Sequence, residues 1–368
     1  MVRWLALAII LFASGAHADA TLGLLSELTG PSAANGEACR QGYEVARQKF
    51  APNDVIGAQK IRFLFGDHKA EAKTAIDEYN RFVKQEDALA VLSNRGNVGM
   101  ALDPLSKQDN VPLIGMMAHI NFIDQNPNGF RFWPSAKTEG AALAQRAYSR
   151  GLRKVASLIL EDDAALAIGN SFEGEFKRLG GEVVFHELVG EKDTDFSTLF
   201  SRARGLKPDL LFIHVAVTQM GIAVKRAREL GLKQPIYSYF WIGYPEVLQS
   251  AGKDALEGTT FISLATDRPL FKKEFEKQFP DQKVVAVTYA CFAGLAFALQ
   301  EIEQNSKDLT REKFLKLLKV SHKVELPDET LKIENREVLF PLEYRVIRDG
   351  QVTSDGEISA SPLSDRKS

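Results

Sequence analysis

Short apolar runs alternate along this chain with longer stretches in which apolar residues recur at helical spacing. In the first third of the chain the apolar runs are residues 21–25, 61–65, 89–92 and 112–115, and we expect each to form a β-strand. Strands that alternate with helices are typical of a parallel sheet covered by helices on both faces. The first third of the chain is therefore predicted to form an α/β lobe.

A second series of strands follows the first. Its apolar runs are residues 155–160, 182–186, 209–214 and 235–239, and the helical stretches between them end at glycine-containing stop signals. Two similar series of elements in one chain indicate two similar lobes.

Two further elements lie beyond the second series. Residues 283–304 predict a long, mostly apolar helix, and residues 335–349 predict a hairpin-like pair of strands. The chain has 368 residues, of which 45% are hydrophobic and 26% charged. That length exceeds what one hydrophobic core usually organises, so we expect two domains.

The N-terminus carries the pattern of a removable export signal. Arg3 precedes the apolar stretch 4–12, and an Ala-His-Ala sequence ending at Ala18 matches the A-x-A pattern that signal peptidase cleaves. Residues 1–18 are thus predicted to be a signal peptide, and the mature chain to begin at Asp19. The alternative is a retained anchor, but the apolar run is shorter than the ~20 residues that a spanning helix needs. We expect a soluble protein in an oxidising compartment, most simply a bacterial periplasm.

The charge balance argues against two classes of partner. The formal net charge is -2, and cleavage would remove one cation, Arg3, and no acidic residue, which gives -3. A chain with this balance has no basic field to recruit nucleic acid or an anionic membrane.

Several short stretches, in this order and spacing, resemble the leucine/isoleucine/valine-binding family of periplasmic solute-binding proteins, which serve ABC importers. They are Leu24-Leu25-Ser26-Glu27-Leu28-Thr29-Gly30-Pro31, Asp67, Asp193-Thr194-Asp195-Phe196-Ser197, Ala227-Arg228-Glu229-Leu230-Gly231, Glu257-Gly258 and Thr288-Tyr289-Ala290. The similarity spans essentially the whole mature chain.

The resemblance implies the type I periplasmic binding protein fold: α/β, with two flavodoxin-like lobes of parallel sheet joined by three crossover strands. Carried onto this sequence, the crossovers fall near residues 133–136, near 263–266 and somewhere in 320–331. Lobe one is then 19–134 plus 265–322, and lobe two is 135–264 plus 323–368. Ligand is trapped between the lobes when they close.

The expected parallel sheets also indicate where a ligand binds, independently of the resemblance. In parallel sheets ligands bind beyond the carboxyl ends of the strands, where helix N-termini present unpaired N–H groups. The candidate loops are residues 29–36, 93–98 and 116–120 in lobe one, and 161–165, 216–218 and 239–244 in lobe two. The resemblance implies the same loops.

These loops depart from the family's amino-acid receptors, which offer hydroxyl groups to the ligand carboxylate and an acidic side chain to its ammonium. The positions matching the hydroxyl groups are Gly96, Asn97 and His119, and the acidic position aligns near Phe240 and Trp241. No clear ammonium partner remains, and an ammonium buried without a paired charge is unfavourable. We therefore expect an apolar or aromatic carboxylate or amide rather than a free α-amino acid.

The predicted binding residues combine an aromatic wall with a few polar groups, since Arg can bind a carboxylate through two hydrogen bonds and Tyr and Trp supply large contact area. They are Asn35, Arg95, Gly96, Asn97, Met117, His119, Trp133, Tyr239, Phe240 and Trp241.

Each of the sharper assignments has a simpler alternative. Phe240 and Trp241 can pack between lobe-two helices, and His119 can be a loop histidine whose hydrogen bonds are all satisfied. Arg95 can be a solvated surface charge or pair with Asp103. Trp133 fits the hinge or the cleft wall better than the core.

Patterns for other chemistry are missing from the sequence. The six histidines show no metal-ligand spacing, and there is neither a phosphate-binding G-x-x-x-x-G-K-[ST] loop nor a G-x-S-x-G nucleophile elbow. Glu161-Asp162-Asp163 can bind a cation, but a solvated loop cap is favoured. We expect no enzyme activity, no cofactor and no metal.

The two cysteines, Cys39 and Cys291, leave two possibilities open. Each lies on the apolar face of a predicted helix, and an even pair in an oxidising compartment often forms a disulfide. Two buried free thiols are the favoured alternative, because cysteine packs well as a small hydrophobe.

The main hypothesis is a monomeric periplasmic protein that closes on a small organic solute and presents it to the membrane subunits of an ABC permease. A ligand-sensing subunit of the same fold, acting on a membrane signalling partner, is the first alternative. An enzyme or a structural protein on the same scaffold is the second.

Overall fold

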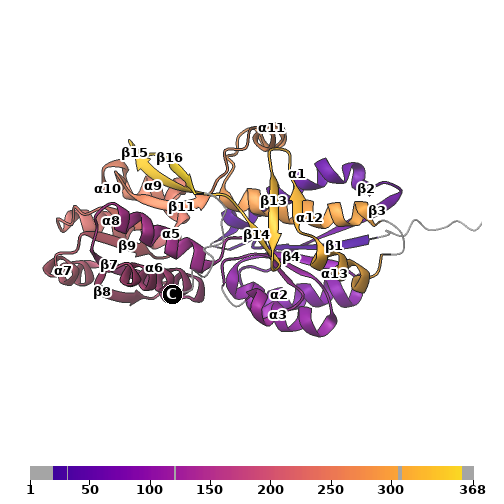
Figure 1. Ribbon diagram of the computed structural model, residues 1–368, viewed down its shortest axis with the longest axis horizontal. Coiled ribbons are helices and arrows are strands. Elements are labelled where there is room, and N and C mark those ends of the chain that lie inside the picture. Colours follow the sequence, from indigo (N-terminus) through magenta and orange to yellow (C-terminus); the bar gives the residue numbers. More distant parts are fainter. Residues whose placement is uncertain (1–19, 31, 120–121, 306–308, 359–368) are drawn as a thin grey trace, which may run out of the picture.

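The computed structural model describes residues 20–30, 32–119, 122–305 and 309–358. They form two lobes along the long axis of the molecule, each with a sheet between layers of helices (Figure 1). Both sheets are mixed but mostly parallel, which confirms the predicted α/β fold class. The predicted signal peptide lies outside the described residues.

Lobe one contains a sheet whose central strands β6, β5, β4, β1 and β3 are parallel, with antiparallel pairs at its edges. In spatial order its strands are β12 (Lys323–Glu325), β13 (Thr330–Glu334), β14 (Glu337–Leu339), β6 (Gly129–Arg131), β5 (Leu113–Met116), β4 (Ala90–Asn94), β1 (Ala20–Ser26), β3 (Gln59–Asp67) and β2 (Val55–Ile56). The four strands predicted for this lobe correspond to β1, β3, β4 and β5.

Helices cover both faces of this sheet, with α1, α11 and α12 on one face and α2 and α3 on the other (Figure 1). The helices of lobe one are α1 (Ala33–Phe50), η1 (Pro52–Asp54), α2 (Ala72–Asn80), η2 (Arg81–Gln85), α3 (Gly96–Asp109), α4 (Phe122–Gln125), α11 (Pro269–Gln278), α12 (Ala286–Gln304) and α13 (Arg311–Val320). The long predicted helix at 283–304 is α12, and nearly all of its residues are buried because it lies between the sheet and α1.

Lobe two contains the second sheet, in which β7 to β11 are parallel and β15 and β16 add an antiparallel edge. In spatial order its strands are β16 (Gln351–Ile358), β15 (Leu342–Arg348), β11 (Thr260–Leu264), β10 (Ile236–Ser238), β9 (Leu210–His214), β7 (Lys154–Leu160) and β8 (Glu182–Val189). The four strands predicted for this lobe are β7, β8, β9 and β10.

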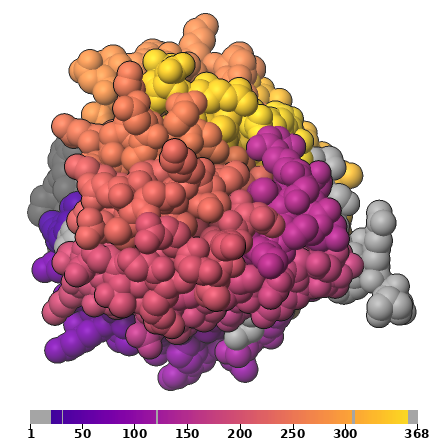
Figure 2. Space-filling model, turned by 90° about the vertical axis from the view of Figure 1, so that its left-hand side faces the viewer, coloured from indigo at the N-terminus to yellow at the C-terminus, as the bar shows by residue number. Residues whose placement is uncertain are grey.

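Lobe two is likewise covered by helices. They are α5 (Ala136–Ser149), α6 (Asp163–Arg178), α7 (Ser197–Gly205), α8 (Val217–Glu229), η3 (Phe240–Gly243), α9 (Pro245–Ala251) and α10 (Lys253–Leu256). Seen from the end of this lobe, the yellow C-terminal strands lie on the surface beside the orange part of the chain that includes β11 (Figure 2). No helix among the described ranges is long and apolar enough to cross a membrane.

The chain passes between the lobes three times. It leaves β6 for α5 through residues 132–135, and it returns from β11 to α11 through residues 265–268. The third passage runs from β14 to β15 through Phe340 and Pro341.

The predicted third crossover, within 320–331, is therefore wrong, as is the assignment of residues 323–339 to lobe two. These residues form β12, β13 and β14, which extend the first sheet at its β6 edge. The predicted hairpin-like pair at 335–349 is also divided: β14 belongs to the first sheet, whereas β15 belongs to the second. The hairpins that form instead are β13–β14 and β15–β16.

An ion pair joins β6 and β14, the two strands of lobe one that lead into the first and third crossovers. Arg131 at the end of β6 is 2% exposed, and its Nη1 donates to Glu337 Oε2 at 3.1 Å. The other oxygen of Glu337 accepts the backbone N–H of Ser135 in the first crossover at 3.2 Å. Burial raises the pKa of Glu337, and the charge of Arg131 opposes that rise. One carboxylate thus connects β14 to the end of the first crossover, at the N-cap of α5.

The two cysteines form a disulfide, so the favoured alternative of two free thiols is wrong. Cys39 in α1 and Cys291 in α12 are bonded, with their Cα atoms 5.3 Å apart. The helices approach closely because Gly42 lies at their contact, where an added Cβ would meet Thr288 O at 2.1 Å. The bond joins two helices of lobe one across a separation of 252 residues.

Candidate ligand-binding cleft

A cavity of about 450 Å³ lies between the two lobes. It is lined by residues that follow the carboxyl ends of β1, β4 and β5 in lobe one and of β7, β9 and β10 in lobe two. Such edges of parallel sheets are where ligands bind, and the volume falls within the range of small-molecule sites. The lining residues are Glu27, Asn35, Asn94, Arg95, Gly96, Asn97, Met116, Met117, Ala118, Trp133, Leu160, Glu161, Asp162, Asp163, Ala164, Glu191, His214, Tyr239, Phe240, Trp241 and Val287.

Most of the predicted binding residues lie at this cavity. Nine of them line this cavity: Asn35, Arg95, Gly96, Asn97, Met117, Trp133, Tyr239, Phe240 and Trp241. The tenth, His119, is half-buried beside the cavity but is not among the lining residues. Its carbonyl oxygen accepts a hydrogen bond from Arg131 Nη2 at 2.7 Å, which ties this loop to the hinge.

Arg95 is positioned at the N-terminus of α3, where the chain turns out of β4. Its φ of +77° lies in a region that side chains rarely adopt, and holding a residue there costs of order 1–3 kcal/mol. The guanidinium Nη1 donates to Ser32 Oγ at 3.0 Å. Ser32, and not Asp103, is thus the partner of Arg95, and the side chain is not a purely solvated surface charge. The next residues, Gly96 and Asn97, bring the unpaired N–H groups of the α3 N-terminus to the cavity.

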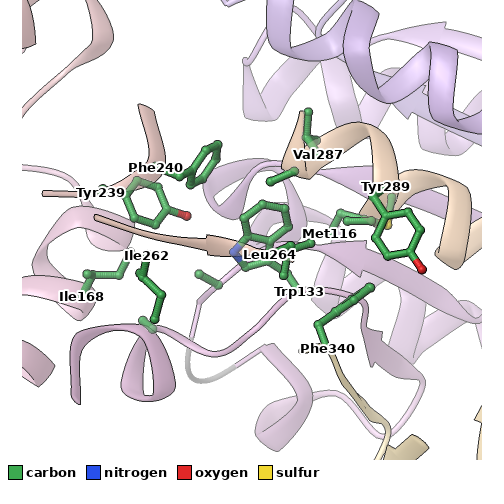
Figure 3. Close-up of a cluster of buried hydrophobic side chains, with 14 of the residues drawn as sticks. Met116, Trp133, Ile168, Tyr239, Phe240, Ile262, Leu264, Val287, Tyr289 and Phe340 are labelled. Atoms are coloured by element: carbon green, nitrogen blue, oxygen red, sulfur yellow. The ribbon is translucent and has the colours of Figure 1, made fainter. Parts of the chain in front are cut away.

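The wall opposite Arg95 is aromatic. Trp133 comes from the first crossover, and its ring lies 5.2 Å from that of Phe240 in lobe two. Tyr239 lies 4.4 Å from Phe240 and 5.2 Å from Trp241, measured between ring centroids. Figure 3 shows the Trp133 indole beside Phe240, with Met116 and Val287 of lobe one continuing the apolar surface. Phe240 and Trp241 thus line the cavity as well as packing against their neighbours.

Beneath the lobe-one side of the cavity lies a buried polar network that the sequence interpretation missed. Glu27 is fully buried, and its Oε1 accepts from Asn35 Nδ2 at 2.7 Å. Its Oε2 lies 3.5 Å from Nε2 of the buried His68. The N–H of Ala70 donates to His68 Nδ1 at 3.0 Å, so the ring proton lies on Nε2, from which His68 donates to Asn94 Oδ1 at 3.3 Å.

This network has a close steric fit and a contact to lobe two. An added Cβ on Gly36 would meet Glu27 O at 2.0 Å, which explains a glycine in the first turns of α1. On the lobe-two side, the hydroxyl of Tyr244 donates to Asn35 Oδ1 at 3.0 Å. Glu27 directly follows the buried strand β1. This position is the one feature of the sequence that could have indicated that Glu27 lies at the cavity.

Carboxylates of lobe two also reach the cavity. Asp162 is the N-cap of α6, where its Oδ1 accepts from the N–H of Ala165 at 2.8 Å. Burial raises the pKa of Asp162, and the positive charge of Arg95 across the cavity partly opposes this. Glu161, Asp163 and Glu191 lie at the exposed rim. The expectation that the cleft holds no clear ammonium partner is therefore corrected, because Glu27 and Asp162 both line it.

His214, the last residue of β9, is a further cavity residue that was not predicted to bind ligand. It is fully buried, and its ring centroid lies 4.6 Å from that of Tyr239 and 5.6 Å from that of Trp241. Burial lowers the pKa of His214 to about 3. The imidazole is therefore neutral at physiological pH.

The described residues contain no group of three or more His, Cys, Asp or Glu side chains that could hold a metal ion. The cavity instead combines one arginine, a helix N-terminus, several aromatic rings and a few buried hydrogen-bonding groups. This is the composition of a site that binds a small organic molecule.

Comparison with known proteins agrees with this geometry. The chain is 22% identical over 288 residues to Leu/Ile/Val-binding protein homolog 3 of Brucella melitensis, covering 76% of this chain and 78% of that protein. Its fold is similar to that of a leucine-binding protein from Thermotoga maritima, with a TM-score of 0.82, 21% identity and coverage of 92% and 98%.

A solute-binding protein of an ABC transporter from Rhodopseudomonas palustris, solved in complex with benzoate, is similar at a TM-score of 0.80. It shares 20% identity, with 93% of this chain and 96% of that chain covered. The family model described as periplasmic binding protein matches residues 19–337. Because this match extends over most of the chain, the protein belongs to the periplasmic binding protein family.

Proposed function

We propose that this protein is the solute-binding component of an ABC importer, and that it closes its lobes on a small carboxylate or amide with an apolar or aromatic body. The observation that carries the proposal is the pairing of Arg95 and the α3 N-terminus in lobe one with the aromatic wall of lobe two. Arginine binds a carboxylate through charge-assisted hydrogen bonds, and aromatic rings bind the rest by contact.

Aromatic acids are the ligands we favour. Trp133, Tyr239, Phe240 and Trp241 surround the cavity with rings that can stack on a ligand ring or meet its edge. Related solute-binding proteins from Rhodopseudomonas palustris, solved with benzoate and with 4-hydroxybenzoate, support this choice. The protein then binds and releases its ligand without chemical change.

The proposal includes where and with what the protein works. The signal sequence directs it to the periplasm, where it acts as a monomer and delivers ligand to the permease subunits of the importer. The family membership of residues 19–337 supports this setting. Sequencing the N-terminus of the exported protein should yield Asp19, and light scattering should give the mass of one chain.

A thermal-shift screen tests the ligand class, because a ligand that binds only the folded state raises its melting temperature. We expect aromatic or aliphatic acids to stabilise the protein, followed by calorimetric titration of the best. Arg95→Ala should weaken binding of the acid by about 10- to 100-fold, the range for a hydrogen bond to a charged group. Arg178→Ala is the matched control, since Arg178 pairs with Glu175 on the exposed face of α6. Equal affinity in both variants contradicts the proposal.

A free α-amino acid is the second candidate ligand, and one observation favours it. The carboxylates of Glu27 and Asp162 lie on the cavity wall, where an ammonium would find an opposite charge. Stabilisation by leucine, isoleucine or valine, abolished by Asp162→Asn, would establish this candidate. Asparagine is as good an N-cap as aspartate, so the variant removes the charge and keeps the start of α6.

A further inference from the structure

His214 is placed at the lobe-two end of the cavity in a setting that calls for an external partner. It ends β9, it is fully buried, and it lines the cavity. The rings of Tyr239 and Trp241 lie against it. The side chain therefore belongs to the aromatic wall, yet it brings two polar nitrogens into it.

Neither nitrogen of this imidazole has a hydrogen-bond partner among the described residues. Buried polar groups in native proteins are nearly always hydrogen-bonded, because an unpaired one forfeits its hydration without compensation. The protein around His214 supplies no such partner, whereas the cavity beside it is the space that a ligand would occupy. A ligand group can thus satisfy what the fold leaves unsatisfied.

The charge state of His214 narrows the chemistry of that group. Burial is the single cause of its lowered pKa, so among the described residues no charged side chain acts strongly on it. A neutral imidazole carries one N–H donor and one acceptor nitrogen. A hydroxyl group can accept from the first or donate to the second, whereas a carboxylate can only accept and is better matched by Arg95 in the other lobe.

We propose that His214 is a specificity-determining residue that hydrogen-bonds a hydroxyl group of the ligand, so that the site prefers a hydroxylated aromatic acid to the same acid without the hydroxyl. This inference rests on the proposed function, in which Arg95 holds the carboxylate. A site built to hydrogen-bond a hydroxyl rejects the analogue that lacks it, because its own polar group is then left unpaired.

Calorimetric titration of the wild-type protein with benzoate and with each of the three monohydroxybenzoates tests this inference. We expect at least one hydroxybenzoate to bind at least 10-fold more tightly than benzoate. His214→Phe keeps a ring of similar shape and removes both nitrogens. In this variant the affinities for the preferred hydroxybenzoate and for benzoate should differ by no more than about threefold. His214→Gln, which retains a donor and an acceptor, should keep part of the preference.

Two results overturn the inference while leaving the proposed function intact: benzoate binding as tightly as every hydroxybenzoate, or a preference that persists in His214→Phe. Failure of all four acids to bind would instead overturn the choice of aromatic acids made under the proposed function, and this inference with it. If the Phe variant does not fold, the ¹⁵N signals of His214 in the wild-type protein decide. They should shift with the preferred hydroxybenzoate and not with benzoate, and equal shifts would refute the role.

Discussion

Tyr244 and Asn35, which belong to different lobes, are joined by a hydrogen bond of 3.0 Å beside the cavity. Asn35 is itself held by Glu27, so Tyr244 contacts a preorganised amide rather than a free side chain. A hinge rotation that separated the lobes would break this bond. It is thus a contact that exists only when the lobes are close together.

Removing this hydroxyl should therefore shift the protein toward the open form. A neutral hydrogen bond contributes about 0.5–1.5 kcal/mol, so Tyr244→Phe should weaken ligand binding by about 2- to 10-fold. Small-angle scattering should show a larger radius of gyration for the ligand-free variant. Tyr344→Phe is the control, because Tyr344 donates to Ala142 O within lobe two. An unchanged affinity for Tyr244→Phe would mean that the bond does not favour closure.

Because the backbone of Arg95 is strained, replacing this residue by glycine should raise the stability of the protein and weaken its binding of the ligand. Arg95→Gly removes the Cβ that makes a φ of +77° unfavourable, so the ligand-free protein should gain about 1 kcal/mol of stability. The same variant loses the guanidinium and should bind an acid more weakly. Denaturant unfolding and calorimetry measure the two effects separately. A less stable Arg95→Gly protein would show that the Ser32 contact outweighs the strain.

Protonation of His214 should destabilise the protein at acidic pH. Its pKa is about 3 in the folded protein and about 6.5 in the unfolded chain, so the unfolded state binds the proton first as pH falls. The contribution of neutral His214 to the free energy of unfolding is fully present above pH ~6.5 and is lost progressively toward pH ~3. By pH 5 the loss should be about 2 kcal/mol relative to pH 7.

Comparison with His214→Phe isolates this effect, because all other titrating groups are shared. The free energies of unfolding of the two proteins are measured from pH 7 to pH 4.5. As pH falls, the value for the wild-type protein should decrease relative to the value for the variant. A constant difference across this range would mean that His214 titrates normally.

The disulfide between Cys39 and Cys291 should stabilise lobe one. Native disulfides in secreted proteins typically contribute 2–5 kcal/mol, so Cys39→Ala with Cys291→Ala should lower the midpoint of unfolding markedly. Alkylation of the denatured, unreduced wild-type protein provides the control. Modification of either thiol there would contradict the bond.

The alternation of apolar runs was enough to predict the parallel cores of both lobes. Most of the predicted strands, namely β1, β4, β5, β7, β9 and β10, are buried on both faces and form continuous apolar segments in the sequence. Strand β14 fell within the predicted hairpin-like pair at 335–349, but β12 and β13 escaped prediction for the opposite reason. They lie at a sheet edge with alternate residues exposed, as in the pattern of Thr330–Glu334, and carry no apolar run. The third crossover was misplaced with them.

The candidate site divides along similar lines. Loops that follow the strands could be predicted, so most of the aromatic wall and Arg95 were found. Glu27 and His214 could not be assigned to the cavity wall, because their place there depends on burial and on neighbours distant in sequence, such as His68 for Glu27 and Tyr239 for His214. In the sequence, a glutamate after one strand and a histidine at the end of another do not indicate that either side chain lies on the cavity wall. Only the folded structure brings them there.

The bond between α1 and α12 also determines how the chain would respond to cleavage. All of β7 to β11 lies between Cys39 and Cys291, inside a covalent ring, whereas β15 and β16 come after it. A protease that nicked any loop of lobe two before residue 264 would leave two fragments still joined through lobe one. On a denaturing gel the two fragments would migrate as one species until a reductant was added. Cleavage within lobe two would therefore be detected only after the disulfide is reduced.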